Sequence, residues 1–208
     1  AYDKAQVLFR DNFFDSMNLG SLLSSTENLK IDFISIQCPQ NVNFINVTFA
    51  NFTFYSQGAL ISAKDMKEIS IQSSQFKSLS ASNLNGLIAI SSQTILVVRS
   101  SFNSIVNREG RGIFSLKNSF ANQGVQIIDT IFDTVESDLE GAVFSVRALE
   151  SEVTAGSVNI TFKISGCQML NILSGNAIQL NTVNCVGCSF KDTYLNISST
   201  VTKNFVNI

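Results

Sequence analysis

Two stretches of the chain decide its fold: residues 69–79 read ISIQSSQFKSL, and residues 95–105 read ILVVRSSFNSI. Both follow the pattern Ile-x-(Ile/Val)-x-x-Ser-x-Phe-x-x-(Leu/Ile), and we call the position of its central Phe the anchor. The two anchors, Phe76 and Phe102, lie 26 residues apart. Self-similarity at such a period predicts a repeat protein in which each copy of the pattern is one structural unit.

The same frame extends over almost the whole chain. Seven and five residues before the anchor, and three after it, nearly every copy carries an apolar residue. We expect these slots to face a common core, because apolar residues that recur at fixed positions mark the buried face of an element. Seven large residues occupy the anchor: Phe14, Phe49, Phe76, Phe102, Phe132, Met169 and Phe190. Two before it stand mostly small residues: Asn12, Val47, Ser74, Ser100, Thr130, Cys167 and Cys188.

A second motif follows most anchors and consists of a Gly and a short apolar stretch. Each such repeat therefore predicts two short strands separated by turns, with a Gly where the backbone needs a special conformation. No segment has a helical period over ten or more residues. The copies are GSLL (20–23), GALI (58–61), GLIAI (86–90), GIFSL (112–116), GAVFSV (141–146) and GNAIQL (175–180).

These repeats resemble those of pectin-lyase-like β-helices, and especially the F-x-x-N…G-G-A-I repeats of polymorphic outer-membrane and other surface proteins. The resemblance implies an all-β chain folded as a right-handed parallel β-helix of about seven rungs, with residues 1–208 as a single domain. The alternative is a leucine-rich-repeat solenoid. Its Asn slot falls here on other residues, which disfavours it: Ser74, Ser100, Thr130 and Cys167.

The spacing of the anchors is irregular at two places. Phe14 and Phe49 lie 35 residues apart, and Phe132 and Met169 lie 37 apart. We therefore expect insertions to protrude near residues 24–40 and 147–160. The frame fits at both ends of the chain without a capping segment, and an uncapped end invites another strand. The module is therefore predicted to continue into a longer chain or to stack end to end.

Cys167 and Cys188 occupy the same small slot in consecutive repeats. Stacked positions lie about 5 Å apart in such a fold, which lies within the range for a disulfide, so this bond is predicted. Free thiols and other pairings remain open. Cys185 and Cys188 form a C-x-x-C, but the chain has no second such pair and no His, which disfavours a redox or zinc site. Cys185 is interpreted as a small core residue, and Cys38 lies in an irregular segment.

Four Asn residues begin N-glycosylation sequons: Asn46, Asn51, Asn159 and Asn196. The alternative interpretation is that they are ordinary turn residues, since Asn is favoured in turns. Together with the predicted disulfide, the sequons predict an extracellular or cell-surface chain that passes through the secretory pathway.

Composition argues against several functions. The net charge is −2 with no basic cluster, which argues against nucleic-acid binding, and no apolar run is long enough to span a membrane. Hydrolases of the pectin-lyase-like fold need carboxylates clustered on neighbouring rungs. In the predicted stack, Asp129 lies between Arg99 and Gly166, and Asp133 lies between Asn103 and Leu170. We therefore expect no enzyme, with no catalytic, cofactor-binding or metal site, and no cofactor.

Several apolar residues are predicted to face outward and are candidates for a lateral interface. Insertions or glycans that cover them are the alternative. They are Ile45, Leu96, Val98, Ile128, Ile131 and Val186. The sequence thus predicts a non-enzymatic, extracellular structural or adhesive module, such as a subunit of a surface filament or coat. Its partners would be further copies or other chains of a surface assembly. The alternative is a carbohydrate-binding or degenerate polysaccharide-processing domain, whose partner would be carbohydrate.

Overall fold

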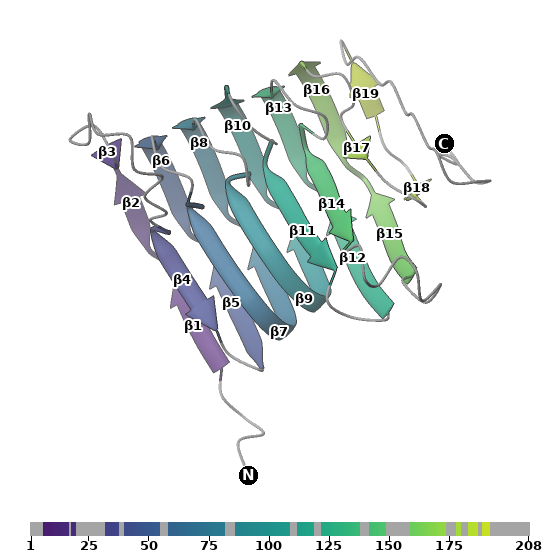
Figure 1. Ribbon diagram of the computed structural model, residues 1–208. Coiled ribbons are helices and arrows are strands. Elements are labelled where there is room, and N and C mark those ends of the chain that lie inside the picture. Colours follow the sequence, from purple (N-terminus) through teal and green to yellow (C-terminus); the bar gives the residue numbers. More distant parts are fainter. Residues whose placement is uncertain are drawn as a thin grey trace.

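In the computed structural model, successive repeats of the sequence stack as turns of a parallel β-helix, which confirms the predicted fold class (Figure 1). Every regular element of the described residues is a strand. The structure describes residues 6–16, 18–19, 32–37, 40–54, 58–81, 86–108, 112–118, 122–137, 142–148, 159–173, 178–179, 183–186 and 189–191.

One sheet holds the anchors, and we call it the anchor sheet. All of its strands run parallel, and each anchor pairs with the anchor of the next repeat, as in Phe49↔Phe76 and Phe76↔Phe102. β3 (Asn18–Leu19) pairs with β6 beside this stack. In stacking order the strands are β2 (Phe13–Asp15), β6 (Thr48–Phe54), β8 (Gln75–Ala81), β10 (Ser101–Asn107), β13 (Ile131–Ser137), β16 (Gln168–Leu173) and β19 (Ser189–Lys191).

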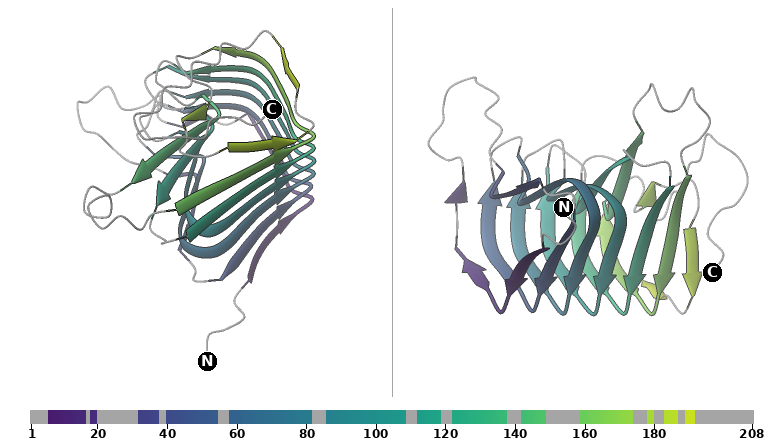
Figure 2. Two further views of the ribbon diagram at one scale, coloured as in Figure 1. Left: turned by 90° about the vertical axis from the view of Figure 1, so that its right-hand side faces the viewer. Right: turned by 90° about the horizontal axis from the view of Figure 1, so that it is seen from below.

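The other sheet is curved and carries both remaining parts of each repeat (Figure 2). In β7 (Ile61–Gln72) and β9 (Ile88–Val98), one long strand begins at the Gly motif and ends just before the corner that leads to the anchor sheet. In the other turns these two parts are separate strands. The parts that precede the corner are β1 (Gln6–Arg10), β5 (Asn41–Ile45), β12 (Asn122–Ile128), β15 (Asn159–Ser165) and β18 (Val183–Val186). The Gly-motif parts are β4 (Ile34–Gln37), β11 (Phe114–Asn118), β14 (Phe144–Ala148) and β17 (Ile178–Gln179).

Each described repeat therefore contributes strands to both sheets. A leucine-rich repeat would supply one strand per repeat, so the alternative solenoid does not describe this chain. Seen along the stack, the two sheets meet at one corner, where the chain turns from the curved sheet to the anchor sheet (Figure 2).

Apart from Asp65, which lies at an irregularity of β7, the non-Gly residues with left-handed backbone fall into two columns. Their φ values lie between 47° and 57°, a region in which Asn and Asp are enriched among non-Gly residues. The first column forms the corner, three residues before the anchor: Asp11, Asn46, Ser73, Arg99 and Asp129, followed by Gly166. The second lies two residues after the anchor: Ser16, Asn51, Ser78, Ser104, Thr134 and Asn171.

The second column breaks the side-chain alternation within each strand of the anchor sheet without shifting the register between strands. The pairing of β8 with β10 passes from Lys77↔Asn103 to Leu79↔Ile105 and skips Ser78 and Ser104 alike. A regular strand would place every second side chain on one face. Because a left-handed residue lies between them, the anchor Phe102 and the third residue after it, Ile105, are both buried.

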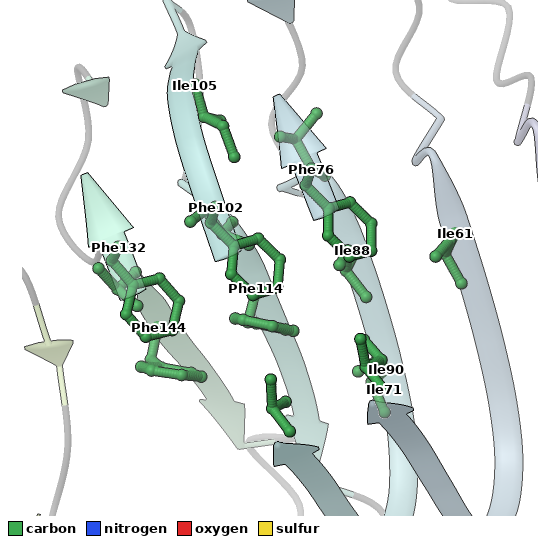
Figure 3. Packing of buried hydrophobic residues seen from close by; sticks show 14 of the residues in the cluster. Ile61, Ile71, Phe76, Ile88, Ile90, Phe102, Ile105, Phe114, Phe132 and Phe144 are labelled. Carbon is green, nitrogen blue, oxygen red and sulfur yellow. The ribbon is translucent and has the colours of Figure 1, made fainter. Parts of the chain in front are cut away.

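The interior contains the predicted aromatic stack (Figure 3). Its ring centroids lie 4.9 Å apart for Phe14–Phe49, 5.1 Å for Phe49–Phe76, 4.6 Å for Phe76–Phe102 and 5.1 Å for Phe102–Phe132. A second stack, Phe114 on Phe144, meets the first edge to face. Offset and edge-to-face arrangements suit the quadrupole of the rings, so both contacts stabilise the core beyond their buried area.

The predicted count of about seven rungs needs a correction. About three turns are shown, and they correspond to β7–β8, β9–β10 and β11–β13, in which nearly all segments belong to the described residues. Further strands stack on both sides of them, but parts of their turns lie outside the described residues. The anchors themselves pair in register from Phe14 to Phe190.

The predicted insertion at residues 24–40 is partly wrong. β4 pairs with β7 through Ile34↔Ile61, and the carboxylate of Asp32 accepts the backbone N–H of Ala59 at 2.8 Å. Residues 32–37 thus form part of a turn, because their alternating apolar residues match the Gly-motif strands. Residues 20–31, which include the GSLL motif, and 149–158 lie outside the described residues.

The predicted need for Gly in the second motif is confirmed at Gly86 and Gly112. Gly86 has φ +78°, and a Cβ on Gly112 would overlap the backbone of Ala142. The backbone bonds place Ala59, Gly86, Gly112 and Ala142 in one column. The motif of residues 58–61 is thus aligned by Ala59, one residue after its Gly.

Candidate interaction surfaces

In three consecutive repeats the small slot before the anchor holds a buried hydroxyl side chain at the corner, and we call Ser74, Ser100 and Thr130 the hydroxyl column. Each side chain donates to the backbone carbonyl two residues earlier: Ser74 Oγ to Gln72 O at 2.9 Å, Ser100 Oγ to Val98 O at 3.0 Å and Thr130 Oγ1 to Ile128 O at 3.0 Å. It also accepts a backbone N–H from the preceding turn. These bonds are Val47 N to Ser74 Oγ at 3.1 Å, Ser74 N to Ser100 Oγ at 3.2 Å and Ser100 N to Thr130 Oγ1 at 3.5 Å.

Cys167 continues this column with sulfur in place of oxygen. Its Sγ lies 3.3 Å from Ser165 O and 3.5 Å from Ile127 O. Burial raises the pKa of the thiol, which is buried and free in the structure. Cys188 and Cys38 lie outside the described residues, so the Cys167–Cys188 disulfide stays a prediction. Cys185 is in β18 and pairs with the buried Ile164 in register.

Two of the sequon residues occupy exposed left-handed positions in the same turn, Asn46 at the corner and Asn51 within β6. Asn46 Nδ2 donates to Asp11 Oδ1 at 2.7 Å, and Asn51 Nδ2 donates to Asp15 Oδ1 at 2.7 Å. Asn159 begins β15, and Asn196 lies outside the described residues. Asn46 is therefore a turn residue and Asn51 a strand residue with left-handed backbone, and their glycosylation stays a prediction.

The bond from Asn51 has an electrostatic consequence. It is the largest influence on Asp15, because it stabilises the charged carboxylate and lowers the pKa of Asp15 below the ordinary value of 3.8. Hydrogen bonds from Ser16 and the charge of Lys77 act in the same direction.

The two acids considered for catalysis have the neighbours that the sequence predicts. Asp133 pairs with Asn103 and Leu170 in the anchor sheet, and it accepts Asn103 Nδ2 at 3.3 Å. Asn171 Nδ2 donates to the same carboxylate at 2.9 Å. Asp129 lies against Gly166, where a Cβ would meet its carboxylate oxygen.

Neither acid therefore has a second acid as its nearest stacked neighbour. Over the described ranges, His, Cys, Asp and Glu form no group of three that could hold a metal ion. A search of the same residues finds no helix long and apolar enough to cross a membrane.

The predicted outward apolar residues are only partly brought together. Val98 pairs with Ile128, and Leu96 shares their face two residues before Val98, so these three half-buried residues are neighbours. Gln72 separates Ile45 from Val98, and Ser165 separates Ile128 from Val186. Ile131 lies beyond the corner and is 41% exposed. The stripe is thus a small patch on β9 and β12.

A more open surface lies at the first described turn. Val7, Phe9 and Phe14 continue the core columns but are only half-buried, and we call them the end surface. Beside them Leu8 is 51% exposed and Phe13 is 64% exposed. The exposure of Leu8 and Phe13 was not predicted from the sequence, because outward slots carry no repeat pattern.

The fold and these surfaces define a parallel β-helix module whose polar groups mostly hold its own turns together. No family model matches the chain, and neither the curated proteins nor the solved structures include one that is significantly similar to it.

Proposed function

We propose that the chain is a non-enzymatic structural or adhesive β-helix module, of the pectin-lyase-like type, which serves as a unit of an extracellular surface filament or coat. The observation that carries the proposal is the end surface. Val7, Phe9 and Phe14 are only half-buried there, whereas the residues of the same columns inside the stack are packed on both sides. Exposed apolar surface of this kind marks sites of protein association.

The use of the acidic side chains supports a structural role. The carboxylates of Asp11, Asp15 and Asp133 each accept an amide hydrogen bond from an Asn of the next turn. Such bonds join neighbouring turns, and the bond from Asn51 lowers the pKa of Asp15. A general acid in glycoside hydrolysis needs the opposite, a pKa that its surroundings raise.

The surface position of two sequons supports an extracellular role. Asn46 and Asn51 are exposed, whereas the middle residues of their sequons, Val47 and Phe52, are buried. A glycan attached to either Asn would therefore project from the surface of the turn without disturbing the core. A bond between Cys167 and Cys188 would fit the same oxidising compartment.

Intact mass of the protein from its native cells, with and without a peptide N-glycosidase and a reductant, tests the location. We expect glycan mass to be lost on enzyme treatment. In recombinant chains secreted from eukaryotic cells, Asn46→Gln and Asn51→Gln should each remove one glycan. Asn171→Gln is the matched control, because Asn171 is exposed in the same column as Asn51 but is not in a sequon. An unglycosylated and fully reduced native chain contradicts the extracellular assignment.

Carbohydrate binding is the second candidate, and Phe13 favours it. This ring is 64% exposed on the same strand face as Asp15, whose carboxylate accepts the amide of Asn51. An apolar ring beside a few fixed polar groups is a common arrangement for binding a small ligand. Affinity electrophoresis in gels that contain pectin or other polysaccharides would test it. Retardation that Phe13→Ala abolishes supports this candidate, and unchanged mobility in every gel rejects it.

A further inference from the structure

We propose that copies of this chain stack head to tail, so that β18 and β19 of one copy pair in parallel with β1 and β2 of the next. Head-to-tail stacking rests on the proposed structural role and names its partner as a second copy of the chain. The surface concerned is the end of the stack at the first turn (Figure 2).

The proposed contact between copies would continue the register of the contacts between turns. Val7 pairs with Val42 and Phe14 with Phe49, and at the other end Phe162 pairs with Val183 and Met169 with Phe190. Val7 and Phe14 are seven residues apart, as are Val183 and Phe190. One further step of the same register therefore places position 183 opposite Val7 and position 190 opposite Phe14.

Among the described residues, the aromatic rings of the first turn lack a stacked ring on one side. The ring of Phe9 stacks on Phe44 at 4.7 Å with an interplanar angle of 3°. Phe76, inside the stack, has a parallel ring on each side, whereas Phe9 and Phe14 have such a ring on one side among the described residues. A turn with the same columns would complete their burial.

Among the described residues, the backbone of the first turn is paired on one side. In the described part of the chain, β1 pairs only with β5, and β2 pairs only with β6. A strand edge with free N–H and C=O groups is a template for another strand. The parallel pairing that β5 and β6 provide on one side is the pairing that this edge can offer on the other.

The residue types at the two ends of the stack have opposite charges in one column. The column that contains Asp15 runs through Ala50, Lys77, Asn103, Asp133 and Leu170 to Lys191. One further step of the register brings position 191 of the next copy to Asp15, so a basic residue meets an acidic one. Head-to-head contact would place like ends together and bring Asp15 near its own copy. The contact therefore has a direction, and a heterologous contact that does not close produces filaments.

Sedimentation velocity over a range of concentrations, with electron microscopy of the same samples, tests the stacking. The parent chain should form species that lengthen with concentration. Asp15→Lys or Lys191→Asp alone should weaken association by about tenfold or more, because like charges then face each other. The double variant Asp15→Lys/Lys191→Asp should restore association. Gln126→Lys is the matched control, since Gln126 is exposed in the middle of the curved sheet, and it should leave association unchanged.

Circular dichroism and thermal melting of each variant show that it is folded before its association is compared. A folded parent chain that stays monomeric at every concentration overturns head-to-tail stacking, as expected if another segment of the natural chain covers the first turn. Single charge reversals that leave association unchanged overturn it as well. A monomeric chain that is still secreted and glycosylated would remove only the stacking. A stacked but intracellular chain would remove only the extracellular part of the proposed function.

Discussion

The backbone N–H of Ser74 donates a hydrogen bond to Oγ of Ser100, 3.2 Å away in the next turn of the helix. Ser100 is buried, and its own hydroxyl hydrogen points to Val98 O. The corner would otherwise leave the N–H of Ser74 without an acceptor, so the hydroxyl satisfies a backbone group that strand pairing does not reach.

Ser100→Ala should destabilise the fold by about 1–3 kcal/mol, because it leaves the buried N–H of Ser74 without its acceptor. Chemical unfolding followed by circular dichroism measures the difference. Ser101→Ala is the control, since the adjacent side chain faces outward, and it should change stability by less than about 0.5 kcal/mol. Equal effects of the two substitutions would show that the column does not stabilise the corner.

Phe102→Ala should cost about 3–5 kcal/mol, because it leaves a cavity in a packed interior. The ring lies between Phe76 and Phe132 and also contacts Phe114 edge to face. Urea unfolding gives the free energy of each variant. The exposed Phe13 serves as the control, and Phe13→Ala should be close to neutral. A Phe102→Ala chain that unfolds like the parent would mean that the anchors are not in the core.

Gly112→Ala should destabilise the chain, because the added Cβ would overlap the backbone of Ala142, which cannot move without shifting a paired strand. Gly124→Ala is a matched control with open space around the added Cβ, and it should stabilise the chain by up to about 1 kcal/mol through the lower entropy of the unfolded state. The two melting temperatures should therefore move in opposite directions. The turn packing described for the Gly motif is wrong if Gly112→Ala melts at or above the parent.

The pKa of Asp15 should lie below 3.8, and Asn51→Gly should raise it toward that value. Gly accepts the left-handed backbone of this position and removes only the amide. Because the pKa of Asp15 is lower in the folded chain than in the unfolded chain, ionised Asp15 stabilises the fold at pH values above its ordinary pKa. That contribution is lost as the pH falls through the lowered pKa. An NMR titration of the carboxyl carbons measures the shift. Asn46→Gly, at the corner, should leave the pKa of Asp15 unchanged. An equal shift in both variants would contradict the assigned cause.

The sequence predicted the stack because the anchors and the slots around them are side chains that pack on their own copies. Phe76 and Phe102 show this directly, since their pairing in the anchor sheet repeats their alignment in the sequence. The residue two after the anchor was not recognised as a left-handed position. Its signal was present in residues that are common in turns, such as Asn51, Ser78 and Asn171, but no single residue type fills the position in every repeat.

The remaining errors came from features that packing between turns decides. Ile34 and Ile36 were assigned to an insertion because the 35 residues between Phe14 and Phe49 exceed the period of 26, yet β4 pairs with β7. The outward stripe rested on repeats that carry an apolar residue four positions before the anchor, but Gln72 and Ser165 interrupt it in the stack. Outward positions carry little pattern because solvent accepts almost any side chain there.

The most direct test of the stacked-repeat architecture is a cysteine pair across two turns. Gln75 and Ser101 are partners in adjacent strands of the anchor sheet, so Gln75→Cys/Ser101→Cys should form a disulfide on mild oxidation. Gln75 and Ile131 lie in the same column but two turns apart, about 9–10 Å by the strand spacing, and Gln75→Cys/Ile131→Cys should not cross-link. Peptide mapping by mass spectrometry distinguishes these bonds from those of the native cysteines. A 75–101 bond without a 75–131 bond is the predicted result, and a 75–131 bond, or neither bond in the folded chain, would contradict the stack.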